Sequence, residues 1–201
     1  MTSSKFDLNK FFMLPQVEEI LAIFKQHGDL SYGEKMSVLS HSIQSGLIAK
    51  DLGLIDSLVV AAYLHDIGHI CPLYEGVKNS MMDGYGLNEH DLLGAHFLER
   101  KGFDETVTVP IRNHVASKRY LCLKDESYFS KLSKASVTTL DFQGGVMDAY
   151  ESLVFENSPL FEESLSLRKI DDEAKEENFM VTENHLDEMA EILNQYLIKL
   201  S

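Results

Sequence analysis

Residues 55–69 have the sequence IDSLVVAAYLHDIGH, and this stretch decides the fold. Its apolar residues cover more than one face of a helix, so we predict a central buried helix from Ile55 to Ile67, ended by Gly68. His65 and Asp66 lie at the end of this helix. Because neighbouring residues differ by about 100° around an α-helix, both side chains can reach one site only where the helix ends or is distorted.

Further histidines recur at a fixed distance on both sides of this pair. The candidate set is His41, His65-Asp66, His90, His114 and Asp171, with 24 residues from His41 to His65, from Asp66 to His90 and from His90 to His114. Successive helices can bring such groups to one point inside a bundle, which is how all-α folds build metal sites. Six groups exceed one ordinary site, so we predict two metal ions that share Asp66 as a bridging carboxylate.

Three other histidines, His27, His96 and His185, fall outside this pattern. For each of them we expect an ordinary hydrogen-bonded or partly exposed imidazole. For the patterned set the same interpretation would need four coincidences of position, so the metal site is the better hypothesis.

Helical periodicity dominates the rest of the chain, and no run of strict alternation calls for a sheet. We therefore predict an all-α fold. The expected helices are Pro15–His27, one opened by a capping box over Ser31–Glu34 and ending near Gly53, one starting at Glu89 and His90, and then Glu105–Lys118, Ser133–Phe142, Pro159–Ile170 and Glu183–Leu200. Residues 76–88 are expected to form a loop, and residues 172–177 a solvated turn. The whole chain, 1–201, is expected to be one domain, with packing helices in the regions of about 1–30 and about 180–201.

The charge balance limits the partners. The formal net charge of -14 opposes binding to nucleic acid or to anionic membranes. A small anion could bind only where a few cations gather. No stretch approaches the roughly 18 apolar residues of a membrane span, and the first residues lack the pattern of a signal peptide. We expect a cytoplasmic protein in which Cys71 and Cys122 are free thiols.

The motif residues resemble the HD-domain superfamily. Its phosphohydrolases share an H…HD…D pattern, matched here by His41, His65-Asp66 and Asp171. The added His90 and His114 are similar to the second-metal ligands of the diiron oxygenase branch, which includes myo-inositol oxygenase and the PhnZ-type phosphonate oxygenases. The resemblance implies an HD-domain helical bundle with one iron held by His41, His65, Asp66 and Asp171, and a second held by Asp66, His90 and His114. Asp172 is an alternative to Asp171.

The same resemblance implies further site residues. Many HD proteins have Lys four residues after the motif histidine, whereas this chain has His69, which is similar to the PhnZ-type pattern. His69, counted as catalytic, is then a group that either supports a ligand or faces the substrate, and not itself a ligand. Lys118, Ser136, Thr139 and Arg168 match in type and order the residues that bind the phosphonate in PhnZ-type enzymes, and Lys118 also counts as catalytic. Each has an ordinary structural alternative: a solvated lysine, common helix residues and a surface ion pair.

Two residues near the start of the motif concern the amine end of the substrate. Glu34 matches the family glutamate that meets the amine, although its place in a capping box is an equally good explanation. The family pattern has a tyrosine three residues before this glutamate, whereas this chain has Ser31 there and Tyr32 one residue later. Tyr32 could instead face a quaternary ammonium through a cation–π contact.

The resemblance implies an oxygenase with a mixed-valent Fe(II)/Fe(III) pair and O2 as co-substrate. It would cleave the C–P bond of a 1-hydroxy-2-(amino or trimethylammonio)ethylphosphonate to give phosphate and glycine or glycine betaine. The alternative is a metal-dependent HD phosphohydrolase that acts on a nucleotide or phosphate ester. A catalytically silent HD protein is disfavoured because no ligand position is missing. The methylation of the amine, a polyol substrate and the oligomeric state stay open.

Overall fold

The computed structural model describes residues 12–31, 35–72 and 81–201. Within these ranges the chain is built of helices, and the one β feature is an isolated antiparallel bridge between Met81 and Leu87. The all-α prediction is confirmed. The helices are α1 Pro15–His27, α2 Val38–Asp51, α3 Asp56–Leu64, the 3₁₀ turn η2 Ile67–His69, α4 His90–Arg100, α5 Glu105–Lys124, α6 Glu126–Lys131, α7 Lys134–Phe142, α8 Ala149–Glu156, α9 Phe161–Glu173 and α10 Glu183–Leu200.

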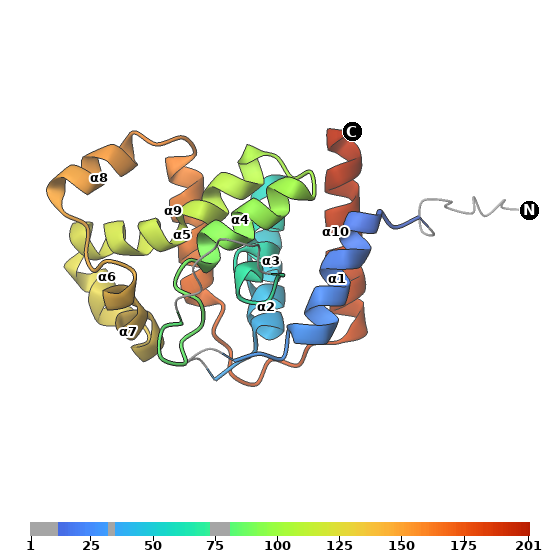
Figure 1. Cartoon of the computed structure of the whole chain (residues 1–201), viewed down its shortest axis with the longest axis horizontal. Helices are drawn as coiled ribbons and strands as arrows, with labels where there is room; N and C mark the ends of the chain where they lie inside the picture. The colour runs from blue at the N-terminus through green and yellow to red at the C-terminus, as the bar shows by residue number, and fades with distance from the viewer. Residues whose placement is uncertain (1–11, 32–34, 73–80) are drawn as a thin grey trace, which may run out of the picture.

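Helix α3 lies at the centre of the molecule (Figure 1) and packs against α2, α5, α9 and α10. Every residue from Ser57 to Leu64 is buried, as expected for a helix that is apolar on several faces. The prediction of a central helix is confirmed, but its end comes at Leu64, before His65 and Asp66. A 3₁₀ turn follows, so the two side chains lie at a break in the helix, where both can face one site.

Gly68 is needed for close packing as well as for ending the helix. A Cβ atom at Gly68 would lie 1.8 Å from the carbonyl oxygen of His90. Only glycine allows η2 to approach the first turn of α4 this closely. The contact brings the residues that follow α3 next to the residue that begins α4.

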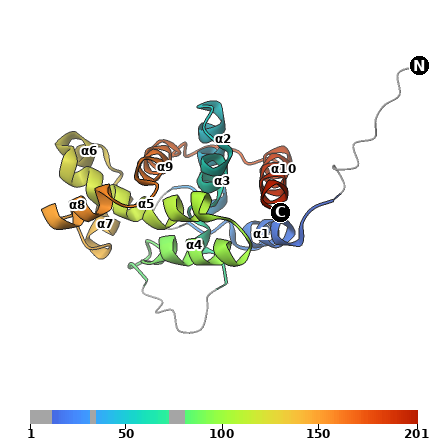
Figure 2. The same ribbon diagram turned by 90° about the horizontal axis from the view of Figure 1, so that it is seen from above.

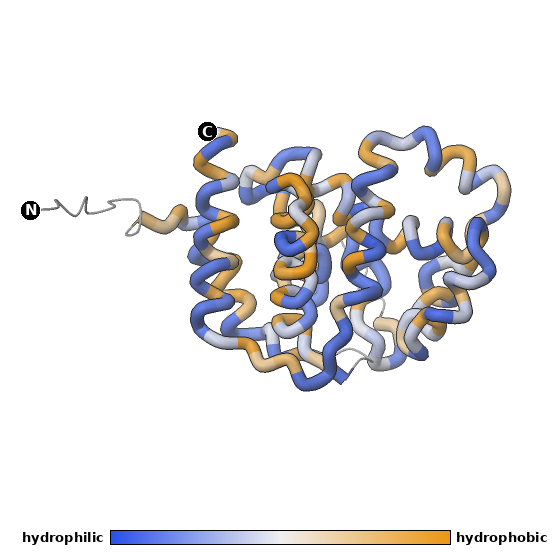
Figure 3. The backbone as a smooth tube through the Cα atoms, turned by 180° about the vertical axis from the view of Figure 1, so that it is seen from behind, coloured by the Kyte–Doolittle hydropathy of each residue, from blue (hydrophilic) through white to orange (hydrophobic). Residues whose placement is uncertain are grey.

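The two terminal helices pack side by side at one edge of the bundle (Figure 1). The predicted bounds of α1 and α10 are both confirmed. Asn194 on α10 connects them, since its amide accepts from the backbone N–H of Leu14 at 2.8 Å and donates to the carbonyl of Phe12 at 3.0 Å. In Figure 3 hydrophobic and hydrophilic segments alternate along α10, as in a helix with one buried face.

The start of α2 corrects the sequence analysis. The helix begins at Val38, and its N-cap is Ser37, whose hydroxyl accepts from the backbone N–H of Ser40 at 3.2 Å. The predicted capping box over Ser31–Glu34 was therefore wrong as the helix start. The reason is tertiary: the N–H of Val38 bonds the carbonyl of Leu30 at 2.9 Å, so the chain folds back on the end of α1 before it turns helical.

Helices α6, α7 and α8 form a lobe at the other end of the molecule (Figure 2). The bounds of α7 match the prediction, with Ser133 as its N-cap, whereas α6 and α8 were missed. A signal for α8 existed, because Asp148 and Glu151 form a capping box. Helix α5 extends to Lys124, past the predicted end at Lys118.

Helix α9 also runs further than predicted, to Glu173, so Asp172 belongs to a helix and not to a turn. One hydrophobic core joins residues from α1 to α10, and a smaller cluster around Phe155 packs α8 against α5 and α9. None of the described helices is both long and apolar enough to cross a membrane. Cys71 and Cys122 are buried free thiols, as expected.

Candidate metal centre

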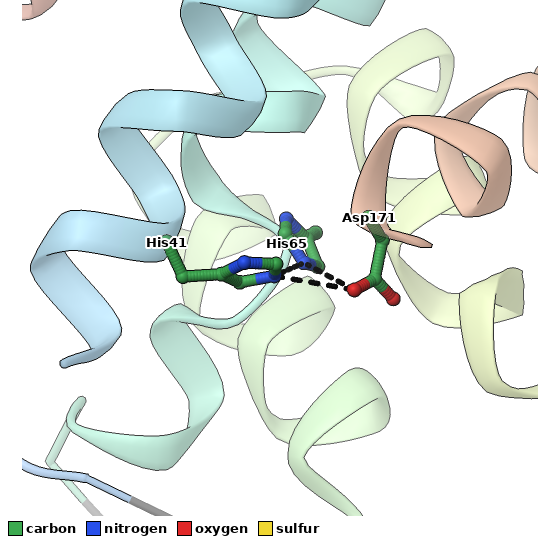
Figure 4. Close-up of side chains that lie close together, drawn as sticks. All are labelled: His41, His65 and Asp171. Atoms are coloured by element: carbon green, nitrogen blue, oxygen red, sulfur yellow. Dashed lines mark hydrogen bonds and ion pairs between the residues drawn. The ribbon is translucent and has the colours of Figure 1, made fainter. Parts of the chain in front are cut away.

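Five elements bring the candidate ligands together in the middle of the bundle. His41 comes from α2, His65 and Asp66 from the break after α3, His90 from the start of α4, His114 from α5 and Asp171 from α9. All six are buried. Figure 4 shows His41, His65 and Asp171 converging from three different elements. The arrangement is the convergence that the 24-residue spacing suggested.

Each of the four histidines is held in one tautomer by a backbone carbonyl. Their Nδ1 atoms bond as follows: His41 to Ala174 O at 2.8 Å, His65 to Ala62 O at 3.0 Å, His90 to Leu87 O at 2.8 Å and His114 to Ile111 O at 2.7 Å. A carbonyl can only accept, so Nδ1 carries the proton in every case. The Nε2 lone pair of each ring is then directed to the centre, as in metal-binding histidines.

The Nε2 atoms form two close pairs. Those of His41 and His65 are 3.1 Å apart, and those of His90 and His114 are 3.0 Å apart. With the protons on Nδ1, each pair places two lone pairs against each other without a hydrogen between them, which is unfavourable unless a cation is shared. Two nitrogens that each lie about 2.1 Å from one metal ion are about 3.0 to 3.4 Å apart. Both pairs therefore fit a metal ion.

Asp66 lies between the two pairs with one carboxylate oxygen for each. Its Oδ2 is 3.6 Å from the Nε2 atoms of both His41 and His65. Its Oδ1 is 3.5 Å from Nε2 of His90 and 3.7 Å from Nε2 of His114. A carboxylate in this position can bridge two ions, as the spacing of the sequence suggested.

Asp171 and Asp172 occupy different surroundings. Asp171 Oδ1 is 3.2 Å from Nε2 of His41 and 3.9 Å from Nε2 of His65. Asp172 instead accepts from Tyr128 Oη at 2.6 Å and pairs with Arg168. The structure thus places Asp171, and not Asp172, with the first histidine pair.

The electrostatics favour ionised carboxylates and a neutral His114, which is the protonation that metal binding requires. For His41, burial lowers the pKa, but the carboxylates of Asp171 and Asp66 outweigh this and raise the pKa above its ordinary value. Burial raises the pKa of Asp66, but the surrounding histidines, His65 foremost, outweigh this and hold it far below its ordinary value. Burial, with repulsion from His90 and His65, lowers the pKa of His114 to about 3. Burial raises the pKa of Asp171, but Arg168 and the neighbouring His41 outweigh this and hold the pKa well below its ordinary value.

His69 lies beside this centre with the opposite tautomer. Its Nδ1 accepts a hydrogen bond from the backbone N–H of Leu87 at 3.2 Å, so in the neutral ring the proton is on Nε2. Burial and the nearby His90 lower its pKa well below the ordinary value, so the ring is neutral. It stacks on His90 with ring centroids 4.0 Å apart. Distance alone would group His69 with Asp66 and His90 as a metal set, but the tautomer favours His114 in that role.

A cavity of about 60 Å³ opens on the centre and contains most of the other predicted residues. Lys118 is buried in its wall, and its Nζ donates to Thr139 Oγ1 at 2.9 Å and to the Ser136 carbonyl at 3.4 Å. Burial, with repulsion from Arg168, lowers the pKa of Lys118 to about 7. Lys118, Ser136, Thr139 and Arg168 all line this cavity, so the structure brings the four together.

Arg168 is more engaged than the sequence suggested. Its Nη1 donates to Asp171 Oδ2 at 2.7 Å, its Nη2 to Asp172, and its Nε to Tyr128 Oη at 2.9 Å. A guanidinium has five N–H donors, so capacity for an anion is left, but two carboxylates offset its charge. Arg168 holds a candidate metal ligand in place as well as lining the cavity.

Several residues that line this cavity were not predicted from the sequence. They are Met36, Met82, Tyr85, Val115, Ala135, Gln143 and Lys175. Gln143 Oε1 is buried with no hydrogen-bond partner among the described residues. A signal for Lys175 existed, since it follows Asp171 by four residues as Lys118 follows His114. Tyr32 and Glu34, both predicted to bind substrate, lie outside the described residues.

Comparison with known proteins identifies an HD domain in this chain. An HD domain matches residues 38–151, a range that contains five of the six candidate ligands but ends before Asp171. A protein of Leisingera caerulea, named [1-hydroxy-2-(trimethylamino)ethyl]phosphonate dioxygenase (glycine-betaine-forming), is 38% identical over 173 residues, which is 86% of this chain and 86% of that protein.

Two more relatives cover most of the chain. A hydroxymethylphosphonate dioxygenase of Gimesia maris is 34% identical over 160 residues, 80% of this chain and 78% of that protein. A protein of Acanthamoeba polyphaga mimivirus whose name states no function is 36% identical over 164 residues, 81% of this chain and 74% of that protein. Each of the three relatives thus matches at least 80% of this chain.

Proposed function

This chain belongs to the HD-domain family, and from that premise we propose that it is an O2-dependent oxygenase that cleaves the carbon–phosphorus bond of an organophosphonate. The observation that carries the proposal is the pair of histidine sets with Asp66 between them. Two relatives of this chain are named as phosphonate dioxygenases. The whole chain, residues 1–201, is proposed to work as one HD unit.

The residues present fit two metal ions. His41, His65, Asp66 and Asp171 would hold the first, and Asp66, His90 and His114 the second. Imidazole and carboxylate donors suit iron, and we propose a mixed-valent Fe(II)/Fe(III) pair. Bound there, the pair would activate O2 and supply the oxidation that the side chains of the protein cannot perform.

The names of the relatives support a proposal for the class of substrate. Both 1-hydroxy-2-(trimethylamino)ethylphosphonate and hydroxymethylphosphonate carry a hydroxyl group on the carbon that is bonded to phosphorus. We propose a 1-hydroxyalkylphosphonate for this chain, with an amino or trimethylammonio group on the next carbon. The C–P bond breaks, one oxygen atom of O2 enters the new carboxylate and the other enters phosphate, so that the products are glycine or glycine betaine and phosphate.

The cavity residues would hold and orient this substrate. Lys118, Ser136 and Thr139 offer an ammonium and two hydroxyls within one small volume, and Arg168 adds N–H donors from the side of Asp171. Fixing the phosphonate in one position matters because small displacements of the reacting carbon slow the reaction strongly. His69 would present its Nε2–H to a substrate oxygen as a neutral donor.

The test is the stoichiometry of O2. Purified iron-loaded protein is given the hydroxylated phosphonate in an oxygen electrode, and phosphate release is measured in the same sample. We expect one phosphate for each O2 and none without oxygen. Phosphate release under strict anaerobiosis, or from phosphate esters with zinc or manganese alone, would establish the HD phosphohydrolase instead.

The second histidine pair gives a sharper form of this test. His90→Ala and His114→Ala each remove a ligand of the second ion, so each is expected to abolish O2 consumption. His96→Ala is the matched control, because His96 lies on α4 as His90 does but is exposed. In a frozen iron-loaded sample, the half-integer-spin resonance of a mixed-valent pair should be present in the control and lost in the two ligand variants.

A further inference from the structure

Lys175 places a second ammonium group in the cavity, and the proposed function does not use it. It lies just after α9, half-buried, and lines the same cavity as Lys118. Its Nζ donates to Ser136 Oγ at 3.3 Å and to Ser133 Oγ at 3.4 Å. The two lysines thus reach Ser136 from different elements, one from α5 and one from the segment that follows α9.

The backbone on both sides of Lys175 is fastened to α2. Before it, the carbonyl of Ala174 accepts from Nδ1 of His41 at 2.8 Å. After it, Glu176 donates its backbone N–H to Gln44 Oε1 at 2.9 Å and accepts from Gln44 Nε2 at 3.2 Å. Gln44 is a buried side chain. A residue outside regular structure is therefore held in place relative to the metal centre, which lowers the ordering cost of binding an anion there.

The contacts of Ser136 set the direction of its hydroxyl proton. Its Oγ accepts from Ser133 Oγ at 3.1 Å and from Lys175 Nζ. A hydroxyl has two acceptor lone pairs and one proton, so with both lone pairs engaged the proton of Ser136 is left to be donated. Lys175 therefore supplies charge and also prepares Ser136 as a donor.

The charges near the cavity indicate that Lys175 is important for binding an anion. The positive charge of Arg168 is offset by Asp171 and Asp172, with which it forms ion pairs. Lys118 Nζ, in contrast, bonds a hydroxyl and a carbonyl, both neutral groups. A doubly charged anion needs a second cation close to Lys118, and Lys175 stands on the other side of Ser136.

We propose that Lys175 is a specificity-determining residue that forms, with Lys118 and Ser136, a cradle for a doubly charged tetrahedral oxyanion. It selects a phosphonate dianion over a singly charged sulfonate of the same shape. The proposal rests on the proposed function for the identity of the anion as a phosphonate. It does not depend on the oxidation step, so binding can test it without turnover.

The experiment measures the binding of methylphosphonate and methanesulfonate to iron-loaded protein by titration calorimetry without oxygen. The pH is chosen so that methylphosphonate carries two charges. Since the pKa of Lys118 in the free protein is about 7, the bound dianion is expected to raise this pKa and so to restore the charge of Lys118. Lys175→Gln is expected to weaken methylphosphonate binding about 10- to 100-fold, the effect of one lost charge-assisted hydrogen bond. Methanesulfonate should lose far less, and Lys175→Arg should retain part of the preference.

Lys169→Gln is the matched control. It removes the same charge from an exposed position on α9, so it reports the general effect of a more negative protein. We expect it to bind both anions as the unaltered protein does. An equal loss in Lys169→Gln, or equal losses of both anions in Lys175→Gln, would overturn the selective role.

Failure of this inference and failure of the proposed function give different results. If the unaltered protein binds methylphosphonate and Lys175→Gln binds it equally well, the inference is wrong and the oxygenase is untouched. If the selective loss occurs but no phosphonate supports O2 consumption, the cradle stands and the oxygenase is wrong. If the unaltered protein binds no methylphosphonate, the cradle itself is refuted.

Discussion

Replacing Asp66 by asparagine should remove the ligand that the two proposed metal sites share. Each carboxylate oxygen of Asp66 faces one histidine pair, at 3.5 to 3.7 Å from the Nε2 atoms. Asparagine has nearly the same shape, but it has one oxygen and no charge, and its NH2 group would direct hydrogens to one of the ions. We therefore expect Asp66→Asn to bind at most one ion in place of two.

The magnitude follows from linkage. An ion that binds only the folded protein stabilises it by about 2.7 kcal/mol when its free concentration is 100 times its dissociation constant. For a chain of this size, 1 kcal/mol corresponds to roughly 2–4 °C in the melting temperature. Each ion should therefore raise the melting temperature by about 5–11 °C, and two ions by about 11–22 °C. Asp66→Asn should show one such increment or none.

The assay is differential scanning calorimetry of metal-free and metal-saturated protein, with the bound metal quantified in the same samples. Each variant is compared with its own metal-free form, so any change in intrinsic stability cancels. Asp141→Asn is the control, because Asp141 is exposed on α7 and its replacement removes the same charge. Two bound ions with the full rise in melting temperature in Asp66→Asn would refute the bridging role.

Three further predictions test other parts of the site. Asp171→Asn should weaken binding of the first ion about 10- to 100-fold, whereas Asp172→Asn should retain both ions, as metal analysis after dialysis will show. Lys118→Met should lower kcat/KM about 100-fold but raise the free energy of unfolding of the metal-free protein by roughly 1–3 kcal/mol. Burial lowers the pKa of Lys118 in the folded protein to about 7. Below that pH the charged side chain therefore lowers the free energy of unfolding by its full amount. Since the cost disappears between pH 7 and the unfolded pKa, the gain in stability should shrink as the pH rises, and a gain that grows would contradict the sign. Gly68→Ala should destabilise the protein by about 3 kcal/mol or more, because its Cβ would meet the carbonyl of His90 at 1.8 Å, and a urea titration measures the loss.

Several helices could be predicted because their signals are local. Pro15 begins α1 and Gly28 follows its end, while α10 has a regular apolar stripe from Glu183 to Leu200. The buried character of α3 also followed from residues 57–64 alone. Such patterns record which faces of a helix meet the core, so they predict elements well. They failed at the start of α2, where Ser37, and not Ser31, is the cap.

The candidate ligands could be chosen from spacing and residue type, because successive helices can bring side chains to the same interior point. The sequence left the choice between Asp171 and Asp172 open, and the packing of α9 decided it. Asp171 and Asp172 are chemically identical neighbours, and only the rotation of α9 against α2 and α5 places one beside His41 and the other beside Tyr128. A choice between adjacent positions on a helix depends on its orientation, which spacing along the chain does not contain.

By itself, the sequence determined that the chain is helical, that a histidine and aspartate cluster lies at the end of a buried helix, and which family it resembles. Only the tertiary structure decided that His69 carries its proton on the opposite nitrogen, that two carboxylates occupy much of Arg168, and that Lys175 shares Ser136 with Lys118. The physical reason is that these properties depend on partners that are distant in the chain. The hydrogen bond from Leu87 to His69, the ion pairs of Arg168 and the hydrogen bonds of Gln44 to Glu176 form only once the helices have packed.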